Sequence, residues 1–196
     1  MKKKVISMVS LLLISVILCL VFSGCSAGGS VEDTYRGGLG FELKLDGSNN
    51  TFSEAVADNV VKSGTYTSEN GIITFSEELL GGSSYLQTVW IAENDVLINE
   101  AEYRDKLSSY GRLQVTSGGI SGEAFLYGEY EFSENGTCVE NNVLTGEGGI
   151  HGYTLDNSGF VYIDNELKGY IYDGVLLSVT SLFIKENLYN SLYPEG

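Results

Sequence analysis

The chain has 196 residues, of which 26 are acidic and 11 are basic, so its formal net charge is −15. This excess of negative charge excludes a general nucleic-acid binder, whose affinity comes from neutralising phosphates, and it disfavours electrostatic docking onto anionic lipid. The apolar content of 43% excludes general disorder, and the length allows one domain or two small ones.

The first 24 residues have the layout of a secretory signal peptide. Lys2, Lys3 and Lys4 form a basic start, and an apolar run from Val5 to Phe22 follows. A retained transmembrane helix is the alternative, because about 18 apolar residues are just enough to cross a bilayer. Removal of this segment leaves eight basic against 26 acidic side chains, so the exported part is more acidic still.

The four residues Phe22-Ser23-Gly24-Cys25 resemble the lipobox of bacterial lipoproteins, an apolar residue and two small residues followed by cysteine. The resemblance implies that Cys25 receives a diacylglyceryl group and becomes the first residue of the mature chain. Phe22 departs from the usual leucine, whereas residues 26–30 are small (Ser-Ala-Gly-Gly-Ser), which favours a flexible tether at residues 25–32. We therefore expect a lipid-anchored protein that faces outward from the cytoplasmic membrane, or one that sits on an outer membrane.

Two further cysteines carry little chemistry in this arrangement. Cys19 lies in the apolar run and leaves with the signal peptide, so Cys138 has no partner and no disulfide framework is expected. As a nucleophile Cys138 would need a nearby base, so we interpret it as a small side chain on a strand.

Short apolar or aromatic runs alternate with Gly, Asn, Asp and Ser from Phe41 to Ile184, which predicts an all-β fold. Strands are expected at Phe41–Leu45, Ser63–Thr67, Gly71–Phe75, Tyr85–Ala92, Val96–Tyr103, Arg112–Thr116, Leu126–Phe132, Thr137–Glu140, Gly149–Leu155, Phe160–Asp164, Leu167–Tyr172 and Val175–Lys185. Glu186–Tyr193 favours a short helix before Pro194, and Ala101–Ser109 favours either a helix or the extension of a strand.

An internal repeat organises these strands. Phe41–Gly47 parallels Tyr130–Gly136, the spacing of Gly64 and Gly71 recurs in Gly152 and Gly159, and Asn94–Ile98 parallels Asp173–Leu177. The offset is nearly constant over the first two pairs. The repeat predicts two tandem antiparallel meanders at 33–106 and 112–187, with a joint at 107–111 and a tail at 188–196. They would form two small barrels or two halves of one barrel.

Three stretches carry a second resemblance: Tyr130–Thr137, His151–Asp156 and Gly174–Leu177. They are similar to the small lipocalin-like domains of exported bacterial lipoproteins, which share "Tyr-x-Phe-x-x-(Asp/Asn)-Gly-Thr", "Gly-x-Tyr" and "(Asp/Asn)-x-Leu". The resemblance implies a β-barrel or half-barrel and, by analogy alone, a binding role.

The sequence shows no pattern typical of catalytic or metal-binding residues. His151 is the single histidine, no Gly-x-Ser-x-Gly elbow accompanies it, and Ser63 takes its place in the first repeat. The run from Asp46 to Asn50 lacks the spacing of a calcium loop, and clusters of His or Cys are absent, so no metal and no cofactor are expected. Scattered acidic residues indicate a solvated surface, although a glycosidase would use two such carboxylates across a cleft; they are Glu77, Glu78, Glu100, Glu102, Asp156, Asp164, Glu166 and Asp173.

The aromatic residues have two interpretations. Trp90 and the 13 tyrosines could line a groove that stacks on sugars or peptides, but tyrosine is also a favoured strand residue, which is the reading we prefer. Tyr170 and Tyr172 share one strand face, as a half-exposed sheet requires. Ligand contacts are most expected on the glycine-rich connections 81–84 and 117–122.

The sequence thus favours non-catalytic binding at the bacterial cell surface, with a small molecule, a glycan or a protein as ligand. An extracellular hydrolase that uses acidic residues is one alternative, and an inhibitor or structural envelope protein is another.

Overall fold

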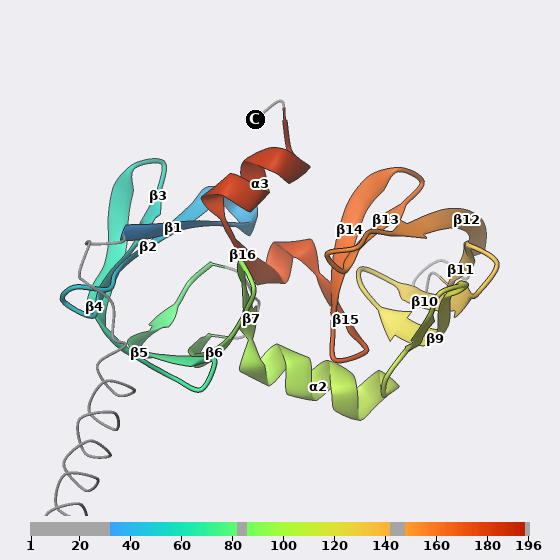
Figure 1. Cartoon of the computed structure of the whole chain (residues 1–196), viewed down its shortest axis with the longest axis horizontal. Helices are drawn as coiled ribbons and strands as arrows, with labels where there is room; N and C mark the ends of the chain where they lie inside the picture. The colour runs from blue at the N-terminus through green and yellow to red at the C-terminus, as the bar shows by residue number, and fades with distance from the viewer. Residues whose placement is uncertain (1–31, 82–85, 142–147, 195–196) are drawn as a thin grey trace, which may run out of the picture. The chain divides into compact units, whose positions relative to one another are not determined.

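The computed structural model describes residues 32–81, 86–141 and 148–194. The expected signal peptide and residues 25–31 of the expected tether, with Cys25, lie outside the described residues. Residues 31–196 form one compact unit. Two antiparallel sheets of eight strands each make up this unit (Figure 1), which confirms the prediction of an all-β protein with two barrel-like sheets.

The first sheet is a closed barrel with the strand order β1-β16-β7-β6-β5-β4-β3-β2. Seven of its strands follow one another along the chain: β1 (Glu32–Gly37), β2 (Phe41–Asp46), β3 (Thr51–Val56), β4 (Asn59–Glu69), β5 (Ile72–Leu79), β6 (Gln87–Glu93) and β7 (Val96–Asn99). The eighth, β16 (Leu182–Lys185), comes from the far end of the chain and pairs with both β1 and β7. Barrel closure leaves no unpaired edge strand that could aggregate.

The second sheet is a half-barrel in which each strand pairs with the next along the chain. Its strands are β8 (Gln114–Thr116), β9 (Gly119–Phe125), β10 (Glu129–Ser133), β11 (Thr137–Asn141), β12 (Gly148–Leu155), β13 (Phe160–Ile163), β14 (Glu166–Tyr172) and β15 (Val175–Ser178). The edge strands β8 and β15 do not pair with each other. One backbone hydrogen bond joins the residues just before them, from the Leu113 N–H to the Gly174 carbonyl at 2.7 Å.

Helix α2 (Glu100–Tyr110) leads from the first sheet to the second. The Asn99 side chain accepts a hydrogen bond from the Glu102 N–H at 3.1 Å, and Gly111, with φ of 74°, ends the helix. The expected strand Val96–Tyr103 is therefore wrong beyond Asn99, because this cap turns the chain into a helix. The helical interpretation of Ala101–Ser109 is confirmed.

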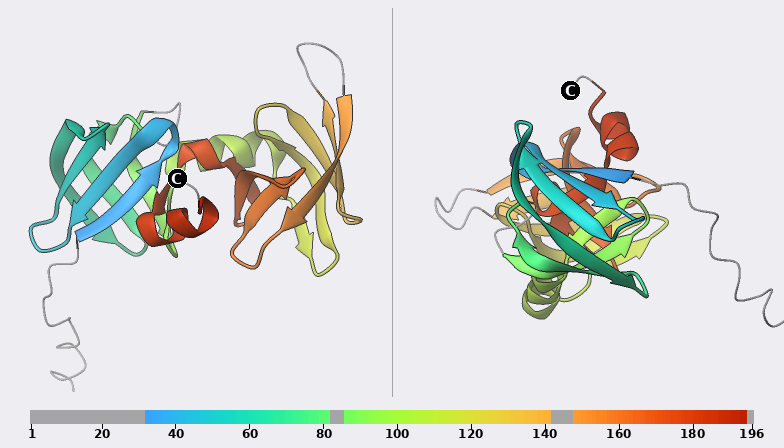
Figure 2. Two further views of the ribbon diagram at one scale, coloured as in Figure 1. Left: turned by 90° about the horizontal axis from the view of Figure 1, so that it is seen from above. Right: turned by 90° about the vertical axis from the view of Figure 1, so that its left-hand side faces the viewer.

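The expected strand Val175–Lys185 is also interrupted. Ser178 caps a short 3-10 turn, η2 (Val179–Ser181), and the chain then enters β16. β16 lies inside the range 112–187 that we expected for the second unit, but it pairs in the first barrel. A final helix, α3 (Glu186–Leu192), confirms the helix expected there; it packs on β1 and β16 (Figure 2).

Three strands have no sequence prediction: β1, β3 and β9. In β3 the inward positions hold Phe52 and the buried Glu54, so the apolar alternation is broken by an acid. β9 begins at Gly119, inside the connection 117–122 that we expected to be a loop. Between β1 and β2 lies a 3-10 turn, η1 (Gly38–Gly40).

The two sheets are repeat-like, as predicted. β2 corresponds to β10, the hairpin β4–β5 to β12–β13, and β7 to β15. Asn99 and Ser178, the last residues of β7 and β15, both cap the helical turn that follows. The next strand after each turn joins the other sheet: β8 joins the second and β16 joins the first.

Side chains fill the interior of the first barrel, where Leu43, Phe52, Phe75, Trp90 and Phe183 are almost inaccessible. Trp90 is fully buried, so it does not line an open groove. Tyr170 is also buried, and it belongs to a cluster in which residues of β7, β15 and β16 pack together. Both residues therefore fit the structural interpretation of the aromatic content.

Candidate functional site

Cys138 lies in the core of the half-barrel and is 1% exposed. Burial, together with the negative charges of Asp164 and Glu140, raises the pKa of its thiol from 9.0 to about 11. The thiolate needed for nucleophilic attack is therefore scarce at neutral pH.

We expect Cys138 to react with a disulfide reagent about 100-fold more slowly than an unperturbed thiol at neutral pH, because the pKa rises by about two units. Cys19→Ser and Cys25→Ser in one chain would leave Cys138 as the single thiol for a colorimetric thiol assay. Denaturant should restore ordinary reactivity. A fast reaction in the folded protein would contradict this account of Cys138.

His151 stands between two carboxylates on the half-barrel. Its Nδ1 lies 2.7 Å from Oδ2 of Asp164, and its Nε2 lies 3.4 Å from Oε2 of Glu140. A side chain at Gly149 would come within 2.6 Å of Nε2, so the glycine makes room for the ring. A histidine that acts as a general base must direct one nitrogen at a nucleophile, but both nitrogens here face carboxylates.

This arrangement stabilises the ionised carboxylate of Asp164. Hydrogen bonds from His151 and from the Gly152 N–H hold the pKa of its carboxyl below the ordinary value of 3.8. The folded protein thus keeps Asp164 ionised at a lower pH than the unfolded chain does. The stability that Asp164 contributes is fully present above its unfolded pKa and is lost as the pH falls through its folded pKa.

Asp164→Asn should therefore destabilise the protein at neutral pH, and the difference in free energy of unfolding from the wild type should shrink below about pH 4. Urea unfolding at a series of pH values measures that difference. A difference that stays constant down to about pH 2 would show that the ionised Asp164 is not what stabilises the fold.

Two of the other predicted acidic residues, Asp156 and Asp173, have structural partners. Asp156 accepts backbone hydrogen bonds in the turn before β13, and Asp173 accepts from Arg112 and Tyr103. Asp46 accepts from the backbone of Ser48 in a tight turn. Within residues 32–81, 86–141 and 148–194, no three His, Cys, Asp or Glu side chains are grouped as metal ligands would be.

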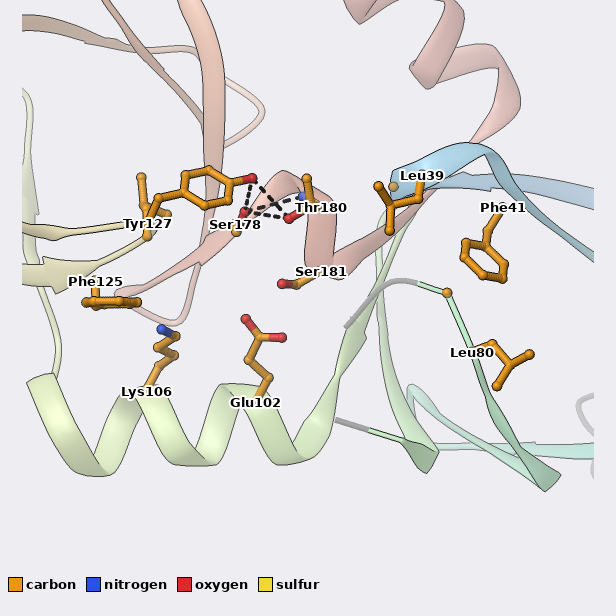
Figure 3. A pocket seen from close by; sticks show the side chains of 13 residues that line it. Leu39, Phe41, Leu80, Glu102, Lys106, Phe125, Tyr127, Ser178, Thr180 and Ser181 are labelled. Atoms are coloured by element: carbon orange, nitrogen blue, oxygen red, sulfur yellow. Dashed lines mark hydrogen bonds between the residues drawn. The ribbon is translucent and has the colours of Figure 1, made fainter. Parts of the chain in front are cut away.

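A cavity of about 590 Å³ lies between η1, α2, η2 and the β9–β10 connection (Figure 3). It lies outside the interior of the first barrel. Its lining comes from stretches far apart in sequence, including 38–41, 80–81, 102–106, 125–127 and 178–181. Both sheets and the helix that joins them thus contribute to one site.

Hydroxyl groups and two opposite charges form the polar side of the cavity. The hydroxyls of Tyr127, Ser178 and Thr180 lie 2.9–3.0 Å from one another. In Figure 3, the side chains of Glu102 and Lys106 point up from α2 toward these groups. Hydroxyls can rotate to donate or accept, so this side can meet a polar group of either kind.

The apolar side is formed by Leu39, Phe41 and Leu80 (Figure 3). Leu39 is 91% exposed and has a φ of 59°, a left-handed conformation that is unusual for leucine. This strained backbone holds a large apolar side chain at the edge of the cavity, where it packs against little of the described protein.

Two glycines allow the walls of the cavity to approach closely. A side chain at Gly38 would meet the Thr180 carbonyl at 2.8 Å, and one at Gly81 would meet the Phe41 ring at 2.5 Å. The buried carboxylate of Glu54 holds the end of β5 in place, because it accepts hydrogen bonds from the N–H groups of Leu80 and Gly81 at 2.7–3.0 Å.

Sequence reasoning did not bring these residues together. The sequence predicts ligand contacts for the connection that contains Gly81, and it indicates Glu102 only as a surface acid. Leu39 and Lys106 were missed, and the one available signal was the helical pattern around Lys106, which would have placed Glu102 and Lys106 on one helix face.

The described helices are too short or too polar to cross a membrane. Comparison of the chain with protein-family models, with curated proteins and with solved structures finds no match.

Proposed function

We propose that the protein is a lipid-anchored, extracytoplasmic binding protein that holds a small molecule without transforming it. The cavity is the observation that carries this proposal. Its volume of about 590 Å³ falls within the range of small-molecule sites, and it combines an apolar wall with a few convergent polar groups. The filled interior of the first barrel directs the proposal to this cavity rather than to a barrel lumen.

The chemistry of the described residues supports a non-catalytic role. Both nitrogens of His151 face carboxylates, and burial raises the pKa of Cys138 to about 11. The alternative, a hydrolase using acidic residues, would need two carboxylates that flank an open cleft. Among the described residues, Glu102 is the one acid that lines the cavity.

The lipid anchor rests on the N-terminal sequence. A basic start, an apolar run and Phe22-Ser23-Gly24-Cys25 together support export and acylation of Cys25. More than one acyl chain is needed for stable attachment, which the diacylglyceryl modification would supply.

Cys25→Ala should abolish incorporation of a clickable fatty acid into the protein in a bacterium that processes lipoproteins, and the precursor should keep its signal peptide. Gel shift and fluorescence of the labelled band measure both effects. Cys138→Ala is the matched control and should label like the wild type. Normal labelling of the Cys25→Ala chain would overturn the proposed anchor.

Mass spectrometry of the protein purified from its own membrane tests the binding role. We expect a bound compound to accompany the wild type and to be lost from Ser181→Trp, in which a large ring fills the cavity. Ile150→Trp places the same ring on a surface that is 79% exposed and should keep the compound. Absence of any bound compound, or equal amounts in all three proteins, would contradict the proposal.

A further inference from the structure

Lys106 differs from every other basic residue in the described ranges. Seven of the eight lysine and arginine side chains form an ion pair with a carboxylate; they are Arg36, Lys44, Lys62, Arg104, Arg112, Lys168 and Lys185. Among the described residues, Lys106 forms no such ion pair. The chain has 26 acidic and 11 basic residues, so a described lysine that forms no close ion pair with a carboxylate is the exception.

The surroundings of Lys106 leave its ammonium group available to a ligand. Its Nζ lies 4.3 Å from the centre of the Phe125 ring and 5.9 Å from that of Tyr110, and the side chain lines the cavity. Aromatic faces stabilise a cation but accept no strong hydrogen bond. Burial lowers the pKa of Lys106, while attraction to Glu102 and Asp105 favours the charged form.

The remaining lining restricts what an anionic ligand can be. Glu102 is 5% exposed and the whole chain is acidic, so a second negative charge on the ligand would be repelled. A single carboxylate can accept from the Lys106 ammonium and from a neighbouring hydroxyl such as that of Tyr127. Leu39, Phe41 and Leu80 then offer an apolar surface to the rest of the molecule.

We propose that the cavity selects an apolar monocarboxylate, with the carboxylate on Lys106 and the apolar body against Leu39, Phe41 and Leu80. This inference rests on the proposed binding function, and it names the ligand class of that site.

Three water-soluble probes of equal chain length test the inference: hexanoate, hexanol and hexylamine. Each is titrated at neutral pH into the full chain, held in phosphatidylcholine nanodiscs, and the methyl NMR signals of Leu39 and Leu80 report occupancy. The wild type should bind hexanoate about 10-fold to 100-fold more tightly than hexanol, which is the range for a hydrogen bond to a charged group. Hexylamine should bind more weakly than hexanoate.

Variants of Lys106 distinguish the effect of its charge on ligand binding from the effect of its shape. Lys106→Met keeps the apolar part of the side chain and should bind hexanoate and hexanol equally, whereas Lys106→Arg should retain the preference for hexanoate. Lys44→Met removes a lysine that pairs with Glu42 and does not line the cavity, so it should behave as the wild type. Unchanged backbone spectra show that each variant folds.

The outcomes distinguish the two proposals. Tightest binding of hexylamine, equal binding of hexanoate and hexanol by the wild type, or a preference that survives Lys106→Met would overturn the monocarboxylate inference and leave the cavity as a binding site. If none of the three probes shifts the Leu39 and Leu80 signals, the cavity is not a small-molecule site and both proposals fail.

Discussion

Phe183→Ala should lower the free energy of unfolding by about 3–5 kcal/mol, the usual cost of truncating a fully buried phenylalanine. Phe183 is 0% exposed, and its ring centre lies 5.4 Å from that of Trp90 in the core of the first barrel. Trp90 is the single tryptophan of the chain, so its fluorescence during urea unfolding reports on this barrel alone.

The expected effect is large because Phe183 lies on the strand that closes the barrel. Ile150→Ala is the matched control: its side chain is 79% exposed, and the cost should stay within about 0.5 kcal/mol. A cost below about 1 kcal/mol for Phe183→Ala would mean that β16 does not belong to the barrel core.

Glu54→Ala should cost about 2–5 kcal/mol, because it removes a fully buried side chain and leaves the N–H groups of Leu80 and Gly81 without their acceptor. Glu54 is 0% exposed. Its two carboxylate oxygens share the Leu80 N–H, and one of them also accepts from the Gly81 N–H. Glu54→Gln keeps the volume and one acceptor oxygen and should cost less than Glu54→Ala. Thermal and urea unfolding of the two variants measure which of them loses more stability.

Glu131→Ala is the control for Glu54, since Glu131 is an exposed acid on an outward position of β10. Its removal should leave the stability within about 0.5 kcal/mol of the wild type. Equal stabilities of Glu54→Ala and Glu131→Ala would show that the buried carboxylate does not hold the end of β5.

Local features of the fold could be predicted from the sequence. Asn70-Gly71 and Asp173-Gly174 are residue pairs that favour tight hairpin turns, and all four residues have positive φ values of 47–77°. The repeat was visible because the two sheets use similar turns at similar spacings. These features depend on neighbouring residues, which a sequence displays directly.

Pairing between distant strands could not be predicted in the same way. The residues of β16 read as a continuation of β15, and nothing in their pattern shows that they pair with β1 and β7. β3 was missed because Glu54 occupies an inward position, and its partners, the N–H groups of Leu80 and Gly81, lie about 26 residues later in the chain.

The cavity was missed for the same reason. Its lining depends on the two connections between the sheets: α2 leads the chain from the first sheet to the second, and η2 leads it back to the first. Leu39, Lys106 and Thr180 become neighbours of one cavity only when both connections are formed.

Hydrogen–deuterium exchange of the purified protein, with its bound compound and after the compound has been extracted, tests most directly whether this cavity is the binding site. The account predicts that the compound protects backbone amides in 38–41, 102–106, 125–127 and 178–181 together, although these segments are far apart in sequence. Protection confined to other parts of the two sheets, with these four segments unchanged, would contradict it.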